Sequence, residues 1–271
     1  MRNYAWIGPV FLGACLCAQA QWVNQPTPGA PRTPDGKVNM TGPVPRLNGK
    51  PDLSGVWMAE AEPRGPGLYG LGEYANSKYF RNILSDFKPD EQPLTAAGAE
   101  LLRKHGQAGA YGNPSLNCLP DGVPHADLLP EPFKILQTTG EIAMLYEVET
   151  IFRQIFIDGR KQLVDPSPTW LGYSVGHWEG DTLVVDTLGF NDRSWLDAMG
   201  HGHSEDMRVE ERFQRRDFGH LDVAVTIEDP KIFTKPFTIH FTELLLADSE
   251  VIELICAEDE KDAAHTAKAA K

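Results

Sequence analysis

Residues 191–205 carry the side chains best suited to acid–base chemistry. His203 is a candidate general base, because imidazole titrates near neutral pH, and Asp197 or Glu205 could orient its ring. These three residues form our candidate catalytic group, which would suit a cofactor-independent hydrolase, lyase or isomerase. The alternative is that they cap turns and hydrogen-bond a loop. The sequence does not decide whether the protein is an enzyme.

The same segment offers a metal site as another alternative. If residues 201–205 are extended, His201, His203 and Glu205 point to one side, because side chains alternate along a strand. Two imidazoles and a carboxylate could hold Zn²⁺ or another divalent ion. The spacing matches no cupin or zincin motif. We therefore expect no cofactor and keep a divalent metal as the alternative.

A second group of residues points to ligand binding. Glu211 shares a strand face with Val209 and Phe213, so it is predicted to point inward. An inward carboxylate needs a partner, and Arg153 is the candidate. Such a pair could bind a polar ligand or serve only the structure. The aromatic candidates would line an apolar cavity or simply fill a core: Trp57, Tyr173, Trp178 and Trp195.

These residues must be positioned by β-strands, because short alternating apolar segments dominate the chain after residue 133. Asp-Gly and Gly-containing turns separate several of them, which favours an antiparallel meander. A sheet this long usually closes to remove its edges, so we predict a mainly β fold, closed into a barrel. The strands are expected at 52–58, 133–138, 142–148, 151–157, 170–178, 182–187, 207–215, 221–227, 237–246 and 251–256.

Residues 60–132 interrupt this pattern and are predicted to be an insertion with loops and helices. Thr95 can N-cap a helix over 96–105, and Gly106 would end it. A short helix is expected within 73–85. Residues 113–132 contain five prolines, so we expect an ordered loop without regular structure there.

The first 20 residues have the features of an export signal. Arg2 precedes an uncharged apolar run over 5–17, and small residues follow at a cleavage site after residue 20. The run is too short to cross a bilayer, which takes about 20 apolar residues. The protein is thus expected to be periplasmic or secreted. Lipidation at Cys15 is the alternative, which would make it a lipoprotein.

The remaining chain divides into three parts. Residues 21–50 are rich in Pro and Gly and are expected to form a surface-wrapping or disordered leader. Residues 51–256 are predicted to be a single β-barrel domain, and 257–271 a polar tail. Cys118 and Cys256 are the cysteines outside the signal, so they are predicted to form one disulfide in an oxidising compartment, with two buried thiols as the alternative.

Charge and missing motifs exclude several function classes. The formal net charge of −13 disfavours nucleic acid and anionic membrane surfaces as partners. The sequence contains no P-loop, dinucleotide fingerprint, CxxC pair or HExxH helix. A small molecule is left as the expected partner, and the oligomeric state is not indicated.

Three stretches resemble a family of uncharacterised secreted bacterial proteins that is common in Acidobacteria. They are residues 51–57, residues 172–187, and the motifs between residues 189 and 205. The likeness covers about residues 51–256 and implies no particular chemistry. In that family His203 and Ser204 belong to the pattern, whereas His201 does not.

A weaker resemblance links the chain to lipocalin-like (calycin) barrels. Their first strand often carries Gly-x-Trp, here Gly55, Val56 and Trp57, with the tryptophan closing one barrel end. This resemblance implies a calycin-like barrel, from which the insertion at 60–132 departs. The resulting expectation is an exported β-barrel that binds a small, partly apolar molecule in the periplasm. The alternative is an enzyme on the same barrel with His203 as its base.

Overall fold

The computed structural model describes residues 25–61, 77–109 and 112–256. The predicted signal, the lipidation site at Cys15 and the tail at 257–271 lie outside these residues. No helix in the described ranges is both long and apolar enough to cross a membrane.

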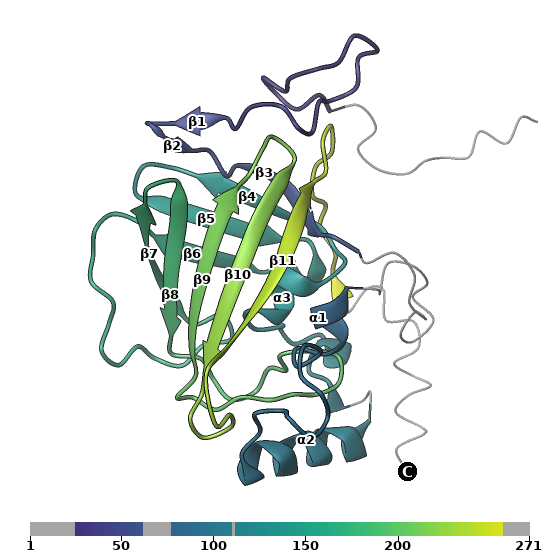
Figure 1. Cartoon of the computed structure of the whole chain (residues 1–271), viewed down its shortest axis with the longest axis vertical. Coiled ribbons are helices and arrows are strands. Elements are labelled where there is room, and N and C mark those ends of the chain that lie inside the picture. The colour runs from purple at the N-terminus through teal and green to yellow at the C-terminus, as the bar shows by residue number, and fades with distance from the viewer. Residues whose placement is uncertain (1–24, 62–76, 110–111, 257–271) are drawn as a thin grey trace, which may run out of the picture.

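A closed barrel forms the body of the protein, as predicted (Figure 1). Its strands follow one another around the ring in chain order, and the last pairs with the first. They are β3 (Gly55–Ala59), β4 (Phe133–Gln137), β5 (Glu141–Tyr146), β6 (Phe152–Phe156), β7 (Tyr173–Glu179), β8 (Thr182–Leu188), β9 (Arg208–Arg215), β10 (His220–Glu228) and β11 (Phe237–Leu245).

The number of barrel strands explains the one departure from the predicted antiparallel meander. Neighbours in a closed ring can all be antiparallel only if the strand number is even, and this barrel has nine. One parallel pair is therefore required, and it is β6–β7. The pairing is short, with Ile155 opposite Ser174 and Phe156 opposite Val175. Residues 157–172 make the crossover between the two strands.

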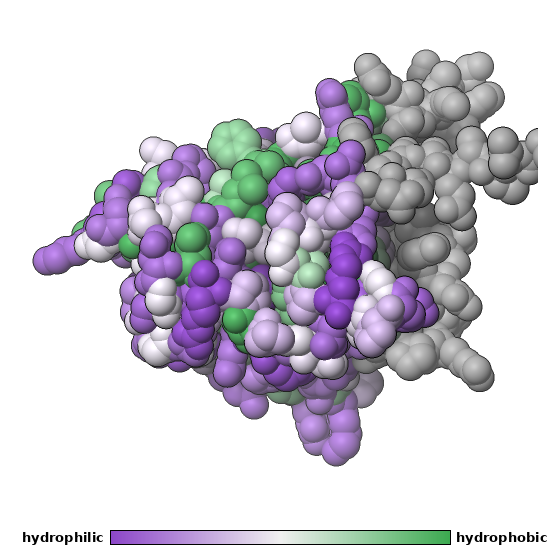
Figure 2. Space-filling view, turned by 90° about the horizontal axis from the view of Figure 1, so that it is seen from above, coloured by the Kyte–Doolittle hydropathy of each residue, from purple (hydrophilic) through white to green (hydrophobic). Residues whose placement is uncertain are grey.

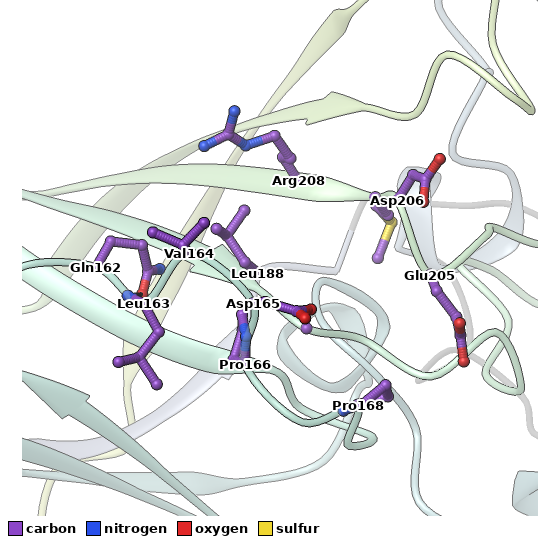
Figure 3. A pocket seen from close by; sticks show the side chains of 12 residues that line it. Gln162, Leu163, Val164, Asp165, Pro166, Pro168, Leu188, Glu205, Asp206 and Arg208 are labelled. Atoms are coloured by element: carbon purple, nitrogen blue, oxygen red, sulfur yellow. Dashed lines mark hydrogen bonds between the residues drawn. The ribbon is translucent and has the colours of Figure 1, made fainter.

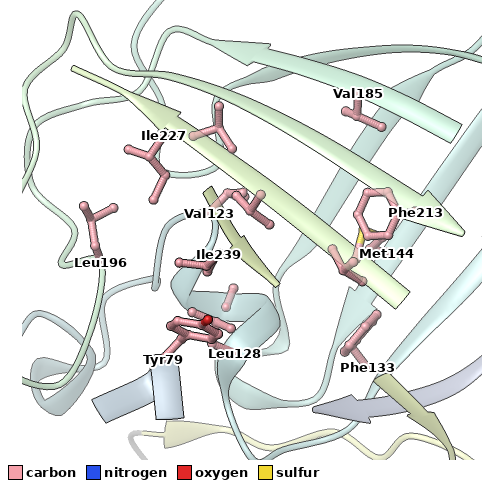
Figure 4. Packing of buried hydrophobic residues seen from close by; sticks show 14 of the residues in the cluster. Tyr79, Val123, Leu128, Phe133, Met144, Val185, Leu196, Phe213, Ile227 and Ile239 are labelled. Atoms are coloured by element: carbon pink, nitrogen blue, oxygen red, sulfur yellow. The ribbon is translucent and has the colours of Figure 1, made fainter. Parts of the chain in front are cut away.

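Alternating burial along the strands places the core inside the barrel. In β10, Leu221, Val223, Val225 and Ile227 are buried, whereas their neighbours are more exposed. Side chains from several walls, among them Val185, Phe213 and Phe133, point toward a shared interior (Figure 4). The barrel interior is thus filled by apolar side chains, and their burial is the main stabilising contribution.

The leader covers one end of the barrel. Its hairpin, β1 (Arg46–Leu47) with β2 (Lys50–Pro51), lies above that end (Figure 1). Phe218 and Gly219 donate backbone hydrogen bonds to the carbonyls of Gly42 and Met40, at 2.9 and 2.7 Å. Viewed from this end, the described surface is mostly hydrophilic with scattered hydrophobic residues (Figure 2). The described leader is therefore a strap across the barrel.

The insertion lies toward the opposite end (Figure 1). It carries α1 (Lys78–Arg81), α2 (Ala96–Ala108), the 3-10 turn η3 (Ser115–Asn117) and α3 (His125–Leu128). Thr95 caps α2 as predicted, accepting a hydrogen bond from the Gly98 backbone at 3.0 Å. The helix continues past Gly106, contrary to prediction, because a helix tolerates one glycine. It ends at Gly109, whose φ of 63° suits a C-cap.

Two other predictions are corrected. Residues 113–132 do contain regular structure, in η3 and α3, because the prolines lie outside these short helices. Residues 251–256 are not a strand, since β11 already pairs with β3 and leaves no free edge. Instead they lie against the 3-10 turn η4 (Val148–Thr150). The Thr150 hydroxyl of this turn donates a hydrogen bond to the Leu254 carbonyl at 2.9 Å. The predicted disulfide between Cys118 and Cys256 is confirmed.

Candidate functional site

A short plug enters the barrel at the end away from the leader. We define the plug as residues 121–128, which include α3. All four α3 residues are buried, and Ala126 and Leu128 belong to the barrel's apolar core. The polar side chain of Asp127 is buried with them and accepts a hydrogen bond from the Tyr146 hydroxyl of β5 at 2.6 Å. The plug therefore brings polar groups into a mostly apolar interior.

Arg153 and Glu211 meet inside the barrel as an ion pair. Two nitrogens of the Arg153 guanidinium each donate to one Glu211 oxygen, with 2.9 Å between Nη1 and Oε1. The remaining donors reach Ser174 on β7 and Thr187 on β8, at 3.1 and 2.9 Å. Burial opposes the charge of Arg153, but the Glu211 carboxylate outweighs burial and raises the arginine pKa. The network thus connects four successive strands, β6 to β9.

Two further carboxyl groups share this interior. Burial, together with the charge of Glu211, raises the pKa of Asp127 to about 7. Glu243 on β11 is buried, and neither of its carboxyl oxygens has a hydrogen-bond partner within the described chain. Burial, reinforced by Asp127, raises its pKa well above the usual range. Burial thus favours the neutral form of Glu243, while the Glu211 carboxylate pairs with Arg153.

A groove lies on the barrel wall just outside this network. Because β6 and β7 pair at only two positions, residues 152–154 and 169–172 diverge. The groove between them has a volume of about 500 Å³. Phe152, Phe156, Trp170 and Tyr173 line it, and the strand positions of Arg153 and Ser174, whose side chains are buried, form part of its floor. We call it the seam groove. Phe152 is 63% exposed in it, so an apolar surface is available to a ligand.

The predicted ligand contacts divide between the seam groove and other places. Tyr173 and Arg153 line the groove, and Glu211 lies behind it. Trp57 is fully buried at the leader end, where the Arg215 guanidinium lies 4.9 Å from its ring centre. Trp178 is partly buried with Lys50 above its ring, and Trp195 stacks on His105. The aromatic candidates therefore do not line one shared cavity.

The three predicted catalytic residues do not come together. His203 is buried, and its Nε2 lies 2.8 Å from the Ser194 hydroxyl oxygen. Burial lowers the pKa of His203. Asp197 instead binds His201, with 2.5 Å between Oδ2 and Nδ1. A bridge between Trp195 and Gly202 folds the segment back, so it is not the extended strand on which the prediction relied.

Glu205 lies on the surface, apart from both histidines. It borders an open groove of about 710 Å³ with Asp206, Arg208 and the loop at 162–168 (Figure 3). Within the described ranges, no group of three or more His, Cys, Asp or Glu side chains is arranged to hold a metal ion. His201, His203 and Glu205 are therefore not assembled as metal ligands.

Sequence reasoning missed several polar residues of this interior. Glu243 could have been found, because it alternates with Phe237, Ile239 and Leu245 just as Glu211 alternates with its apolar neighbours. Asp127 and Ser194 carried no such signal, since both lie outside regular strands.

No family model, curated protein or solved structure matches this chain.

Removing one partner of the Arg153–Glu211 pair should destabilise the protein strongly. Arg153→Met leaves a buried carboxylate without its counter-charge and is expected to cost about 3–5 kcal/mol in the free energy of unfolding. The double variant with Glu211→Leu should cost less than the sum of the single variants. Urea unfolding measures these values. Arg212→Gln, which breaks an exposed pair with Glu179 on the same sheet, should change stability by about 1 kcal/mol or less. Equal losses from Arg153→Met and Arg212→Gln would contradict a structural role for the buried pair.

The buried carboxyl groups should make the protein more stable in mild acid than in mild base. Asp127 and Glu243 have raised pKa values, so between about pH 4 and 7 the folded protein holds protons that the unfolded chain has released. The free energy of unfolding should therefore fall as pH rises through this range. Glu131, Glu147 and Glu149 act in the same direction, because burial raises their pKa values.

Urea unfolding at several pH values checks this expectation. Asp127→Asn and Glu243→Gln should each flatten the pH dependence in part, whereas Glu228→Gln, at an exposed strand end, should leave it unchanged. A stability that rises from pH 5 to pH 8 would show that these carboxyl groups are ionised in the folded state.

Proposed function

We propose that the protein is an exported β-barrel that binds a small, partly apolar molecule in the seam groove, outside the cytoplasm. The observation that carries this proposal is the opening between β6 and β7, where the exposed Phe152 and three partly buried aromatic side chains line a groove on the barrel wall. Binding sites are typically apolar hollows with a few fixed polar groups. The seam groove has this composition.

The site proposed here is in the barrel wall rather than in a central cup. Apolar side chains fill the interior, and the plug occupies the end away from the leader. Phe152 and Trp170 offer apolar surface to a ligand, and the exposed Gln154 and Thr169 offer polar contacts beside them. Behind the groove, the buried Arg153 guanidinium holds Ser174, Thr187 and Glu211, which fixes the strands that flank the groove.

The location of the protein and its relationship to calycin barrels are also proposals. The Cys118–Cys256 disulfide is compatible with an oxidising compartment, which supports a periplasmic or secreted location. Gly55 and Trp57 lie on the first barrel strand, with Trp57 buried beside Arg215. This placement supports a calycin-like relationship. The nine strands and the parallel pair separate the fold from a simple eight-stranded cup.

Binding of an aromatic probe tests the seam groove. Anilinonaphthalene sulfonate should bind the folded protein saturably, with enhanced fluorescence. Phe152→Ser and Trp170→Ala each remove an aromatic contact of about 1 kcal/mol, so each should weaken binding about fivefold. Leu163→Ser removes a comparably exposed apolar side chain from the other groove and should leave binding unchanged. Lack of saturable binding, or equal losses in all three variants, would contradict the proposal.

A second candidate function is hydrolysis by Ser194 with His203 as its base. The observation in its favour is the hydrogen bond between the Ser194 hydroxyl and Nε2 of His203, an arrangement typical of a nucleophile and its base. Nδ1 of His203 in turn donates to the Ser204 carbonyl at 3.1 Å. However, Ser194 and His203 are each only 2% exposed, and Ser194 packs closely on Gly122 of the plug. A substrate would have to displace the plug, so we place this candidate, and a lyase or isomerase using the same base, second.

A serine-directed fluorophosphonate separates the two candidates. We expect no labelling of the folded protein, because the Ser194 hydroxyl is covered. Labelling located at Ser194 by mass spectrometry, and lost in His203→Ala, would make hydrolysis the function. Ser174→Ala serves as a control, since Ser174 has no histidine partner among the contacts of the described chain.

A further inference from the structure

A second buried polar group lies between the plug and the turn η4. The Asp121 backbone donates to Oε2 of Glu149 at 2.9 Å, and Nδ1 of His125 lies 3.0 Å from Oδ1 of Asp121. Asp121 and His125 are 2% and 1% exposed. These three residues are distinct from the Arg153 network, and nothing in the proposed function uses them.

Each of the three side chains has an unsatisfied polar atom. Oδ2 of Asp121, Oε1 of Glu149 and both ring nitrogens of His125 are buried without a hydrogen-bond partner in the described chain. Buried polar atoms are nearly always paired, so such exceptions call for a missing partner. The two carboxylate oxygens among these four atoms accept hydrogen bonds. A donor would therefore satisfy them.

Asp121 and Glu149 line a small cavity. Glu131 and Tyr146 add two polar walls, and the other lining residues are apolar. The free volume is about 10 Å³, which corresponds to roughly one water-sized group. No lysine or arginine is among the described residues that line it. The cavity therefore combines negative charge with room for one small donor.

The backbone around Glu149 is held in an unusual conformation. Glu149 and Thr150 have φ values of 61° and 49°, in the left-handed region that side chains other than glycine seldom adopt. The position is restrained from both sides, by the Asp121 backbone bond and by the hydrogen bond from Thr150 to the C-terminal segment. Strain of this kind is retained where the surroundings fix a residue, often at binding sites.

We propose that this cavity binds an ammonium group, either the ammonium ion itself or the –NH₃⁺ head of a small primary amine. Such a group is close to water in size, carries one positive charge and has several N–H donors for the two free carboxylate oxygens. A metal ion fits less well, because no set of three ligands within the described ranges is arranged around one point. We call this cavity the ammonium pocket.

A proton on the Glu149 carboxyl group competes with this ligand. Burial and the neighbouring Asp121 raise the pKa of Glu149 to about 8. A cation prefers the ionised carboxylate, so binding must release a proton. The apparent affinity should therefore rise as pH rises toward 8, by up to about tenfold per pH unit.

The other titratable groups facing the ammonium pocket act in the same direction. Burial opposes protonation of His125, but Asp121 outweighs burial and raises the histidine pKa; loss of that proton at higher pH also favours a cation. Asp197 contributes to the same raised pKa. Glu131 has a raised pKa through burial and Glu147, and Tyr146 remains neutral because burial raises its pKa.

Calorimetric titration of the intact protein with ammonium chloride and with methylammonium chloride tests the proposal. We expect one saturable site at pH 8.5, with affinity about twenty-fivefold lower at pH 6.5. Binding of both cations indicates the head of a primary amine, and binding of ammonium alone indicates the free ion. Tetramethylammonium, which has no N–H donor and is too large, should not bind.

Variants distinguish this site from other acidic surfaces. Glu149→Gln and Asp121→Asn should each weaken binding at pH 8.5 at least about tenfold, because each removes a charged acceptor. Both remove a buried charge without changing side-chain shape, and circular dichroism checks their folding. Glu253→Gln, a matched change on the exposed C-terminal segment, should have no effect. The proposal is overturned if neither ammonium nor methylammonium binds the unsubstituted protein at pH 8.5, or if Glu149→Gln binds as tightly as Glu253→Gln.

Discussion

Ring closure is the constraint on which the arrangement of this protein depends. An odd number of strands cannot alternate in direction all the way round, so one junction must join strands that run the same way. That junction falls at β6–β7, where only two residue pairs are formed. The weak ladder produces the seam groove, and the crossover at 157–172 supplies one of its aromatic walls, Trp170. A geometric requirement of the fold thus creates the hollow to which we assign binding.

The buried carboxyl groups inside the barrel are arranged around one arginine. Arg153 donates hydrogen bonds to three strands, and Glu211 matches its charge. Asp127 shares Arg153 at 3.8 Å with the closer Glu211, and Glu243 has no hydrogen-bond partner within the described chain, so burial favours the neutral forms of both. Burial likewise raises the pKa of Glu149, but this carboxyl group faces a cavity rather than a packed core. Whether a buried acid meets side chains or free space therefore separates a structural carboxyl group from a candidate binding site.

Local signals in the sequence predicted much of the fold. Alternation located all nine barrel strands within a few residues, Thr95 was identified as a helix cap, and cysteine use predicted the disulfide. The inward position of Glu211 and its pairing with an arginine also followed from alternation. Each of these features depends on residues close in sequence or on simple chemical complementarity.

The features that were not predicted depend on contacts between residues that no local sequence pattern describes. Alternation shows which face of a strand is buried but not which way its neighbour runs, so the parallel seam was missed. His203, Asp197 and Glu205 were grouped because they are close in sequence, yet the bridge at Trp195 and Gly202 sends them to different surroundings. Residues 251–256 have the composition of a strand, but the ring was already complete without them.

The disulfide also determines which parts of the barrel are covalently tied together. Cys118 and Cys256, 138 positions apart, enclose the chain from β4 to β11 in one cross-linked loop. Among the barrel strands only β3 lies outside that loop, and β3 joins β11 to β4. The barrel can therefore open at β3 while its other eight strands stay tethered to the plug. If unfolding starts from the N-terminal side, β3 is lost first and the other eight strands stay in one cross-linked sheet. The barrel would then close again when β3 pairs with β11 and β4.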